Sequence, residues 1–239
     1  PGLPESRQFI NKVVRDIVSR YDVDAIHMDD YFYPYPAAGM PFPDDKSFQK
    51  YGLNKGYTNA QRSDWRRENV NTLIRELKRT ILLTKPWVRF GISPFGIYRN
   101  KKSTPDGSGS DTNGLQNYDD LYADILHWVK EGWIDYNMPQ IYWEIDHPAA
   151  DYITLIQWWN KNATLEGPHL YIGQDVARTM KASQLTRKMR YERALSKVKG
   201  NCFWPANELL WNNKGVADSL KRNYHRYPAL IPAYTHMHN

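Results

Sequence analysis

The stretch that decides the fold is Val23-Asp24-Ala25-Ile26-His27-Met28-Asp29-Asp30-Tyr31-Phe32-Tyr33-Pro34. Its apolar part, which follows a helix-like segment, predicts a buried parallel strand. Because side chains alternate along a strand, His27 and Asp29 share one face, and Met28 and Asp30 share the other. α/β enzymes, and barrels above all, carry their catalytic residues at the C-terminal ends of the parallel strands, and these two acids stand at such an end. The alternative, in which one aspartate caps a loop and the other pairs with an arginine, stays open.

Strand-like runs alternate with helical patterns along the whole chain. Helices are predicted at residues 5–20, 59–84, 118–130, 151–160, 183–198 and 216–226, and strands at 23–28, 88–93, 134–142, 169–172 and 201–204. Five alternations without a hairpin signal require a parallel sheet with helical crossovers. No glycine-rich phosphate loop follows any strand, so a TIM-type (β/α) barrel is favoured over a doubly wound nucleotide-binding fold. The long loop at residues 33–58 is expected to be ordered and to line the mouth of a site.

The overall composition limits the domain organisation and the kinds of partner that the chain can have. The chain has 239 residues, enough for one large domain with a substantial core, and 14% of them are aromatic, a share that suits stacking against sugar rings or bases. The formal net charge of +6 mildly favours anionic partners. The basic residues are scattered over predicted helices, however, so nucleic-acid binding is not expected.

The cysteine count and the hydropathy exclude further classes of protein. The single cysteine, Cys202, cannot form an internal disulfide framework or a cysteine-rich zinc site. No stretch approaches the ~18–20 apolar residues that a membrane span needs. The chain begins with Pro1 rather than Met, which suggests a trimmed N-terminus and makes the lack of a signal peptide uninformative.

Four of the five predicted strands end in an acid. These acids are Asp29 with Asp30, Glu144 with Asp146 just beyond, Asp175 and Glu208, and aromatic residues stand around them: Tyr31, Tyr33, Tyr98, Tyr142, Trp143, Trp204 and Trp211. Carboxylates ringed by aromatics suggest glycoside hydrolysis, in which one acid protonates the leaving oxygen and another attacks the anomeric carbon or activates water. The alternative is metal-assisted hydrolysis. No His-x-His or His-Glu-x-x-His pair supports a metal centre, and no cofactor is expected.

Strand parity ranks these candidates. Asp29 is expected to point inward and to act as nucleophile or base, while Asp30 points toward a helix or loop in a more structural position. By the same parity Glu144 stands at the mouth, as the general acid.

The remaining polar candidates keep two interpretations each. His27 orients Asp29 or is a core histidine. Gln140 binds a sugar hydroxyl or fills a layer of the barrel. Asp175 clamps substrate or caps the helix after it.

Several motifs resemble the glycosyl-hydrolase-like family 10. They are Pro1-Gly2-Leu3-Pro4-Glu5, Tyr21 to Pro34, Phe90-Gly91-Ile92-Ser93-Pro94-Phe95-Gly96-Ile97, Pro139-Gln140-Ile141-Tyr142-Trp143 and Tyr171-Ile172-Gly173. The resemblance implies a TIM-type barrel in secreted or envelope-anchored bacterial proteins, one of which cleaves peptidoglycan strands stripped of their peptides. It also implies that Asp29 is the nucleophile, through a looser similarity to α-amylase-type barrels. Ala25 stands where the family usually has Gly.

We therefore expect residues 1–239 to form one catalytic domain, a glycoside hydrolase acting on a cell-wall glycan. The alternatives are a glycosidase for another polysaccharide and a carbohydrate-binding barrel without turnover. Because only five strand–helix units are found, and the resemblance places them as strands four to eight, the barrel is expected to be open. Its bare edge strands, residues 23–28 and 201–204, should be covered by a loop or a partner chain, which makes oligomerisation one outcome.

Overall fold

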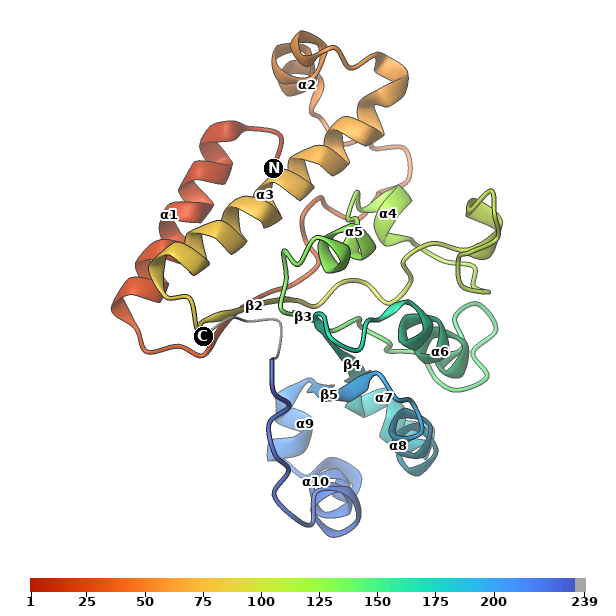
Figure 1. The fold of residues 1–239 in the computed structure, drawn as a ribbon. Coiled ribbons are helices and arrows are strands. Elements are labelled where there is room, and N and C mark those ends of the chain that lie inside the picture. Colours follow the sequence, from red (N-terminus) through yellow and green to blue (C-terminus); the bar gives the residue numbers. More distant parts are fainter. Residues whose placement is uncertain (235–239) are drawn as a thin grey trace.

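A parallel five-stranded sheet forms the centre of the computed structural model, which describes residues 1–234 (Figure 1). The strands are β1 (Ala25–Met28), β2 (Arg89–Ile92), β3 (Tyr136–Asn137), β4 (His169–Asp175) and β5 (Val198–Trp204), in the spatial order β1-β2-β3-β4-β5. Every neighbouring pair is parallel. The predicted α/β fold with a parallel sheet is confirmed. Within residues 1–234, β1 and β5 each pair with a single strand, so this sheet has two edges.

Helices connect the strands. They are α1 (Pro4–Arg20), α2 (Asp45–Tyr51), α3 (Arg62–Thr84), α4 (Asn117–Asp120), α5 (Ile125–Lys130), α6 (Tyr152–Asn162), α7 (Val176–Lys181), α8 (Leu185–Arg193), α9 (Ala206–Leu210) and α10 (Val216–Ser219), which continues into a π-helical turn, Leu220–Tyr224. Pro4 occupies the first turn of α1, where its missing N–H is no loss. Figure 1 shows α1 and α3 side by side at one end of the sheet and α7 to α10 at the other.

Two sequence predictions were wrong in detail. The single helix expected at residues 118–130 is broken into α4 and α5, because Tyr122 has a left-handed φ of 56° and the Asp124 carboxylate caps a new helix by accepting from the His127 N–H. The strand expected at residues 134–142 has only two paired residues in β3, and beyond them the chain continues as isolated bridges at Gln140.

The strand register separates two faces of the sheet. On one face Phe90, Ile92 and Ile172 are fully buried in the main hydrophobic core beneath the helices. The opposite face carries His27 and Tyr136, which the register aligns through Gly91. A Cβ atom at Gly91 would come within 2.0 Å of the Tyr136 ring, so only glycine lets that ring lie across β2.

The C-terminal segment crosses this opposite face near the start of the strands. The Tyr234 ring stacks on His169 with centroids 3.9 Å apart, and its hydroxyl lies 3.0 Å from that of Tyr171. Residues 224–229 also line a pocket with Val198 to Asn201 of β5. The segment therefore passes beside the β5 edge, one of the two edges expected to need cover.

The loop at residues 33–58 is ordered and contains α2. Phe48 of α2 is fully buried and meets the Trp65 ring edge-on. Tyr33 was expected to line a groove, but this was wrong: it is 2% exposed and packs between Phe42 and Tyr122. Desolvation of that large ring outweighs the cost of leaving its buried hydroxyl without a hydrogen-bond partner among the described residues.

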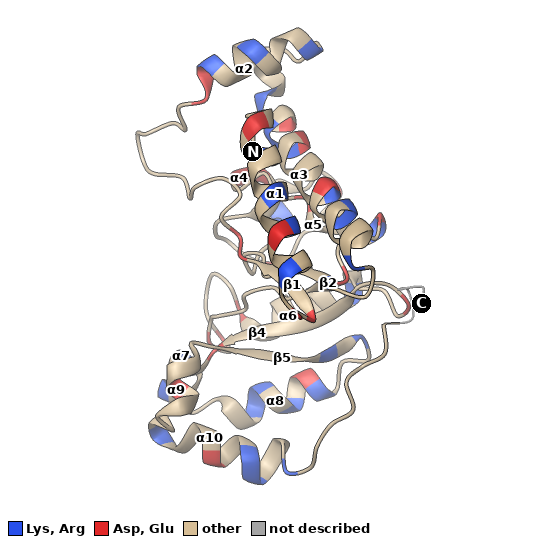
Figure 2. Cartoon of the chain, turned by 90° about the vertical axis from the view of Figure 1, so that its left-hand side faces the viewer, with Lys and Arg blue, Asp and Glu red and all other residues tan. Residues whose placement is uncertain are grey.

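Lys and Arg outnumber Asp and Glu on α8, whereas α1 and α3 carry charged side chains of both signs (Figure 2). Several basic residues of α3 are engaged within the protein: Arg66 with Asp44 at 2.7 Å, and Lys78 with the buried Asp135 at 2.6 Å. These pairings neutralise two of the basic side chains of α3. In residues 1–234 no helix is both long and apolar enough to cross a bilayer.

Candidate active site

Asp29 lies just beyond β1, on the same face as His27, and its side chain is exposed. The Asp29 Oδ1 accepts two hydrogen bonds, from the Asp30 backbone N–H at 2.9 Å and from the Gln140 side-chain amide at 2.7 Å. These two donors fix the rotamer of the carboxylate. The geometry is that of an oriented carboxylate at the C-terminal end of a parallel strand.

Asp30 has a different environment from its neighbour, because it is 2% exposed. Burial raises the pKa of Asp30 to about 6, with the negative charge of Asp29 acting in the same direction. The Tyr35 hydroxyl donates to Asp30 Oδ2 at 2.5 Å and partly offsets this rise in the pKa. Two adjacent carboxyl groups thus have opposite environments, one exposed and one buried, as the two members of a catalytic pair do.

Gln140 positions Asp29 from the third strand. Its amide nitrogen donates to Asp29 and also, at 2.9 Å, to the Ser93 carbonyl, so the ends of three strands meet at this one side chain. The turn after β2 allows this approach at Gly96, where a Cβ atom would come within 2.4 Å of the Gln140 carbonyl. Gln140 is therefore bonded to a carboxylate, a role the sequence had not indicated.

Tyr142 and Trp204 form an aromatic wall beside the acids. Their rings stack with centroids 5.4 Å apart and planes 13° apart, and Trp204 is 52% exposed. Burial raises the pKa of Tyr142, and the charges of Cys202, Asp29 and Asp175 raise it further. The Tyr142 hydroxyl therefore lies within the electrostatic reach of Asp29 on β1 and Asp175 on β4.

Asp175 caps a helix, one of the two roles that the sequence left open. Its carboxylate accepts from the Arg178 N–H at 2.9 Å at the start of α7 and lies 3.4 Å from the Arg178 guanidinium. A carboxylate bonded in this way at the start of a helix is held in one place. Its charge raises the pKa of Tyr142 from a fixed position.

Glu144 is half-buried, and no hydrogen bond or ion pair joins its carboxylate to another of residues 1–234. Its charge acts on Lys188: burial lowers the pKa of Lys188 to about 8, and the charge of Glu144 opposes that decrease. The Lys188 ammonium donates to the Trp143 carbonyl at 2.8 Å and to the Thr179 hydroxyl at 3.0 Å. Lys188, which the sequence did not single out, therefore anchors the backbone next to Glu144.

The other predicted site residues lie in varied places. Tyr31 is 71% exposed and stacks on Tyr35. His27 makes its hydrogen bond with the Tyr136 hydroxyl at 3.2 Å rather than with Asp29, and burial lowers its pKa. Trp143 packs edge-on against Phe95.

Tyr98 and Tyr33 do not join the group around Asp29. The Tyr98 hydroxyl donates to Asp124 at 2.8 Å and its ring stacks on Trp158, so the prediction that it lines this site was wrong. Tyr33 lies in the core, as described above. Both follow a strand in the sequence, but each loop turns its tyrosine toward a neighbouring helix.

The side chains around Asp29 supply carboxylate, amide and aromatic groups. In the part of the chain that the structure describes, no three His, Cys, Asp or Glu side chains are grouped so as to hold a metal ion. Tyr35, like Tyr33 and Trp143, was expected to line a groove, but its hydrogen bond to Asp30 was not predicted, because only its place in a loop five residues after Asp30 could have suggested the contact. The arrangement can bind a sugar ring against Trp204 and present Asp29 to it.

Comparison with known proteins agrees with this chemistry. A model of the family described as Glycosyl hydrolase-like 10 matches residues 1–190. The chain is 44% identical over 240 residues to glycosyl hydrolase YngK of Bacillus subtilis (strain 168), covering 97% of this chain and 46% of YngK. It is 42% identical over 173 residues to glycosyl hydrolase DigH of Escherichia coli (strain K12), covering 72% of this chain and 38% of DigH. The chain thus spans less than half the length of these two relatives.

Proposed function

Because the chain belongs to the glycosyl hydrolase-like 10 family, we propose that it carries the reacting carboxylates of a glycoside hydrolase. The observation on which this rests is the pair at the end of β1: an exposed, doubly bonded Asp29 beside a buried Asp30 whose pKa is raised to about 6. Asp29 attacks the anomeric carbon, or takes a proton from the water that does so. Asp30 is too buried to touch a sugar, and it tunes its neighbour.

Glu144 is the proposed general acid. It is half-buried, it is not held by any partner among the described residues, and it follows the strand that supplies Gln140. It delivers a proton to the leaving oxygen as the glycosidic bond breaks. Glu144→Gln is then expected to slow hydrolysis of substrates with poor leaving groups far more than that of activated aryl glycosides, which need no acid. Equal losses on both substrates would remove Glu144 from this role.

The proposed substrate is a bacterial cell-wall glycan of the peptidoglycan type, met outside the cytoplasm. Support comes from the motifs shared with a family whose relatives are bacterial glycosyl hydrolases, and from the exposed Trp204 ring stacked on Tyr142. We also propose that the sheet is the larger part of a TIM-type barrel, whose remaining wall lies beside the β1 or β5 edge. The test is to incubate the full-length protein with glycan strands freed of peptides and to identify products by mass spectrometry, with Asp29→Asn as the control. Intact strands after incubation with the native protein would refute the cell-wall substrate.

Two other functions follow from the same geometry. The Tyr142–Trp204 platform alone would serve a carbohydrate-binding domain without turnover. Binding of glycan without any cleavage, on cell-wall strands and on other polysaccharides alike, would favour that function. Cleavage of another polysaccharide only would keep the proposed chemistry and change the substrate.

A further inference from the structure

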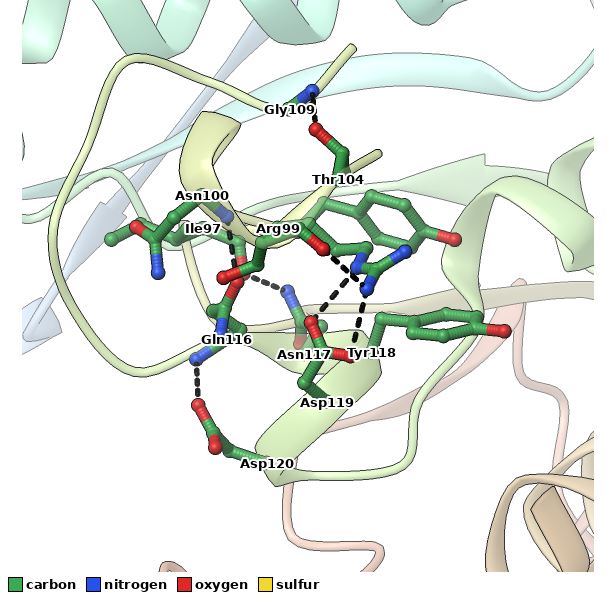
Figure 3. Close-up of polar contacts among 12 residues, drawn as sticks. Ile97, Arg99, Asn100, Thr104, Gly109, Gln116, Asn117, Tyr118, Asp119 and Asp120 are labelled. Carbon is green, nitrogen blue, oxygen red and sulfur yellow. Dashed lines mark hydrogen bonds and ion pairs between the residues drawn. The ribbon is translucent and has the colours of Figure 1, made fainter. Parts of the chain in front are cut away.

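A second hollow lies away from the acids, beside the long segment between β2 and α4. This segment is fixed by buried polar groups rather than by a helix (Figure 3). The Asn100 backbone N–H donates to the Gln116 side chain at 2.7 Å, and the Asn117 amide donates to the Ile97 carbonyl at 2.9 Å. Asn100 is 2% exposed and Asn117 fully buried. An irregular segment whose buried amides are bonded in this way holds one shape before any ligand arrives.

The hollow has a volume of about 560 Å³ and two walls. One wall is the fixed segment itself, from Thr104 to Gly109, where the Thr104 hydroxyl accepts from the Gly109 N–H at 3.1 Å (Figure 3). The other is aromatic and consists of Tyr98, Tyr118 and Trp158. A cavity of this size accommodates one or two sugar rings or another molecule of similar bulk.

The aromatic wall is held in place by contacts within the protein and is partly exposed to solvent. The rings of Tyr98 and Trp158 stack with centroids 5.7 Å apart and planes 22° apart. The Trp158 indole N–H donates to the Ser108 carbonyl at 2.8 Å, which ties the aromatic wall to the segment. Tyr98, Tyr118 and Trp158 all keep partial exposure, whereas the neighbouring Trp159 is 1% exposed. Fixed aromatic faces that remain accessible are the surfaces against which the C–H faces of sugars pack.

The polar groups around the hollow favour an uncharged ligand. The Arg99 guanidinium is already occupied by the Asp119 carboxylate, at 2.8 and 3.0 Å, and by the Ser103 carbonyl (Figure 3). Asp106 stands at the rim, where hydrogen bonds from Ser108 lower its pKa and keep it ionised. The Asn162 amide nitrogen donates to the Trp158 carbonyl, which leaves its oxygen as an acceptor. These oxygens accept hydrogen bonds from hydroxyl groups and repel carboxylates.

We propose that this hollow is a second, non-catalytic carbohydrate site that takes a neutral pyranose, such as an N-acetylhexosamine, against Trp158. None of its lining residues belongs to the group around Asp29. It therefore binds sugar whether or not the chain hydrolyses glycans, and it gives an enzyme on a polymeric substrate a second point of attachment. Tyr98, which did not join the active-site group, belongs to this site.

The test is an NMR titration of the tryptophan indole N–H signals of the full-length protein, nine of which come from this chain, with N,N′-diacetylchitobiose as the probe. The Trp158 signal is expected to shift, and Trp158→Ala to weaken this binding roughly fivefold to tenfold, the factor that one stacked aromatic contact carries. Trp87→Ala removes a ring that is 64% exposed elsewhere and serves as the matched control, with binding unchanged. If Trp158→Ala does not fold, Asp106→Ala, at a fully exposed rim residue, is expected to weaken binding several-fold.

Three results would overturn the proposal. The first is a Trp158 signal that does not shift at millimolar concentrations of the probe. The second is binding to Asp106→Ala and Trp158→Ala that equals binding to the native protein. The third is tighter binding of a uronic acid than of the neutral sugar. The Trp204 signal reports on the Asp29 site in the same spectra. A shift at Trp204 without one at Trp158 therefore refutes this proposal and leaves the proposed hydrolase function intact.

Discussion

Glu192→Gln tests whether burial raises the pKa of a carboxyl group on α8. Glu192, on α8, is 3% exposed and accepts hydrogen bonds from Tyr152, Gln174 and Asn201. Burial raises its pKa from 4.5 to about 7, against the effect of these bonds and of the nearby Lys188 charge. Because this pKa is higher in the folded than in the unfolded chain, the stabilisation is complete below pH 4.5 and is lost as the pH rises through about 7.

The size of this loss follows from the pKa difference. Moving a carboxyl pKa from 4.5 to about 7 corresponds to ~3 kcal/mol of unfolding free energy between pH 4.5 and 7.5. A glutamine does not titrate, and its carbonyl oxygen keeps the bonds from Tyr152 and Gln174, while Asn201 turns its amide to accept from the new N–H₂. The stability of Glu192→Gln relative to the native protein should therefore rise by about 3 kcal/mol over this range.

The assay is urea unfolding of both proteins at a series of pH values. Asp30 titrates in a similar range in both proteins, so its contribution cancels, and the difference between the two curves reports Glu192 together with its interaction with Lys188. Glu166→Gln, at an exposed position, is the control and should run parallel to the native protein. Parallel curves for Glu192→Gln as well would refute the assignment of a raised pKa to this residue.

Three further changes, Tyr35→Phe, Gln140→Ala and Trp204→Ala, probe the site, and a fourth, Tyr33→Ala, probes the core. Tyr35→Phe removes the hydrogen bond that lowers the pKa of Asp30, so this pKa should rise above about 6 in a carboxyl-carbon NMR titration; a fall would contradict the contact. Gln140→Ala removes the hydrogen bond to the Asp29 carboxylate and should reduce glycan cleavage about tenfold or more at an unchanged melting temperature. An unchanged rate would show that the hydrogen bond from Gln140 to Asp29 does not contribute to cleavage. Trp204→Ala should weaken glycan binding without loss of stability. Tyr33→Ala, in contrast, should lower the unfolding free energy by ~3–5 kcal/mol. The reverse pattern would place Trp204 in the core and Tyr33 in the binding site.

Local periodicity in the sequence predicted the parts of the fold that depend on local physics. The alternation along residues 23–30 separated an exposed Asp29 from a buried Asp30, because neighbouring side chains of a strand point to opposite faces. The 3.6-residue spacing predicted a long helix over residues 59–84, which the structure contains as α3. The absence of hairpin signals was enough to predict a parallel sheet.

The features that the sequence did not reveal depend on contacts between distant segments. Gln140 reaches Asp29 across 111 positions, and Lys188 reaches the Trp143 carbonyl across 45. The helix break at Tyr122 was hidden because this residue adopts a left-handed φ that tyrosine rarely takes, and packing against Tyr33 and Arg66 accompanies it. Tyr33 was placed in a groove because its sequence neighbours are loop residues, although its burial is decided by Phe42 and α3.

The central claim is that Asp29 is the reacting carboxylate of a glycosidase, and the most direct test compares two adjacent isosteric changes in the full-length protein. Native protein, Asp29→Asn and Asp30→Asn are incubated in parallel with peptide-free glycan strands, and the initial rates of product formation are measured by mass spectrometry. The side-chain amide introduced by Asp29→Asn keeps an oxygen for both hydrogen bonds that hold Asp29, so folding should survive, and the rate should fall at least ~10²-fold. Asp30→Asn should retain measurable turnover. An active Asp29→Asn beside an inactive Asp30→Asn would contradict the account.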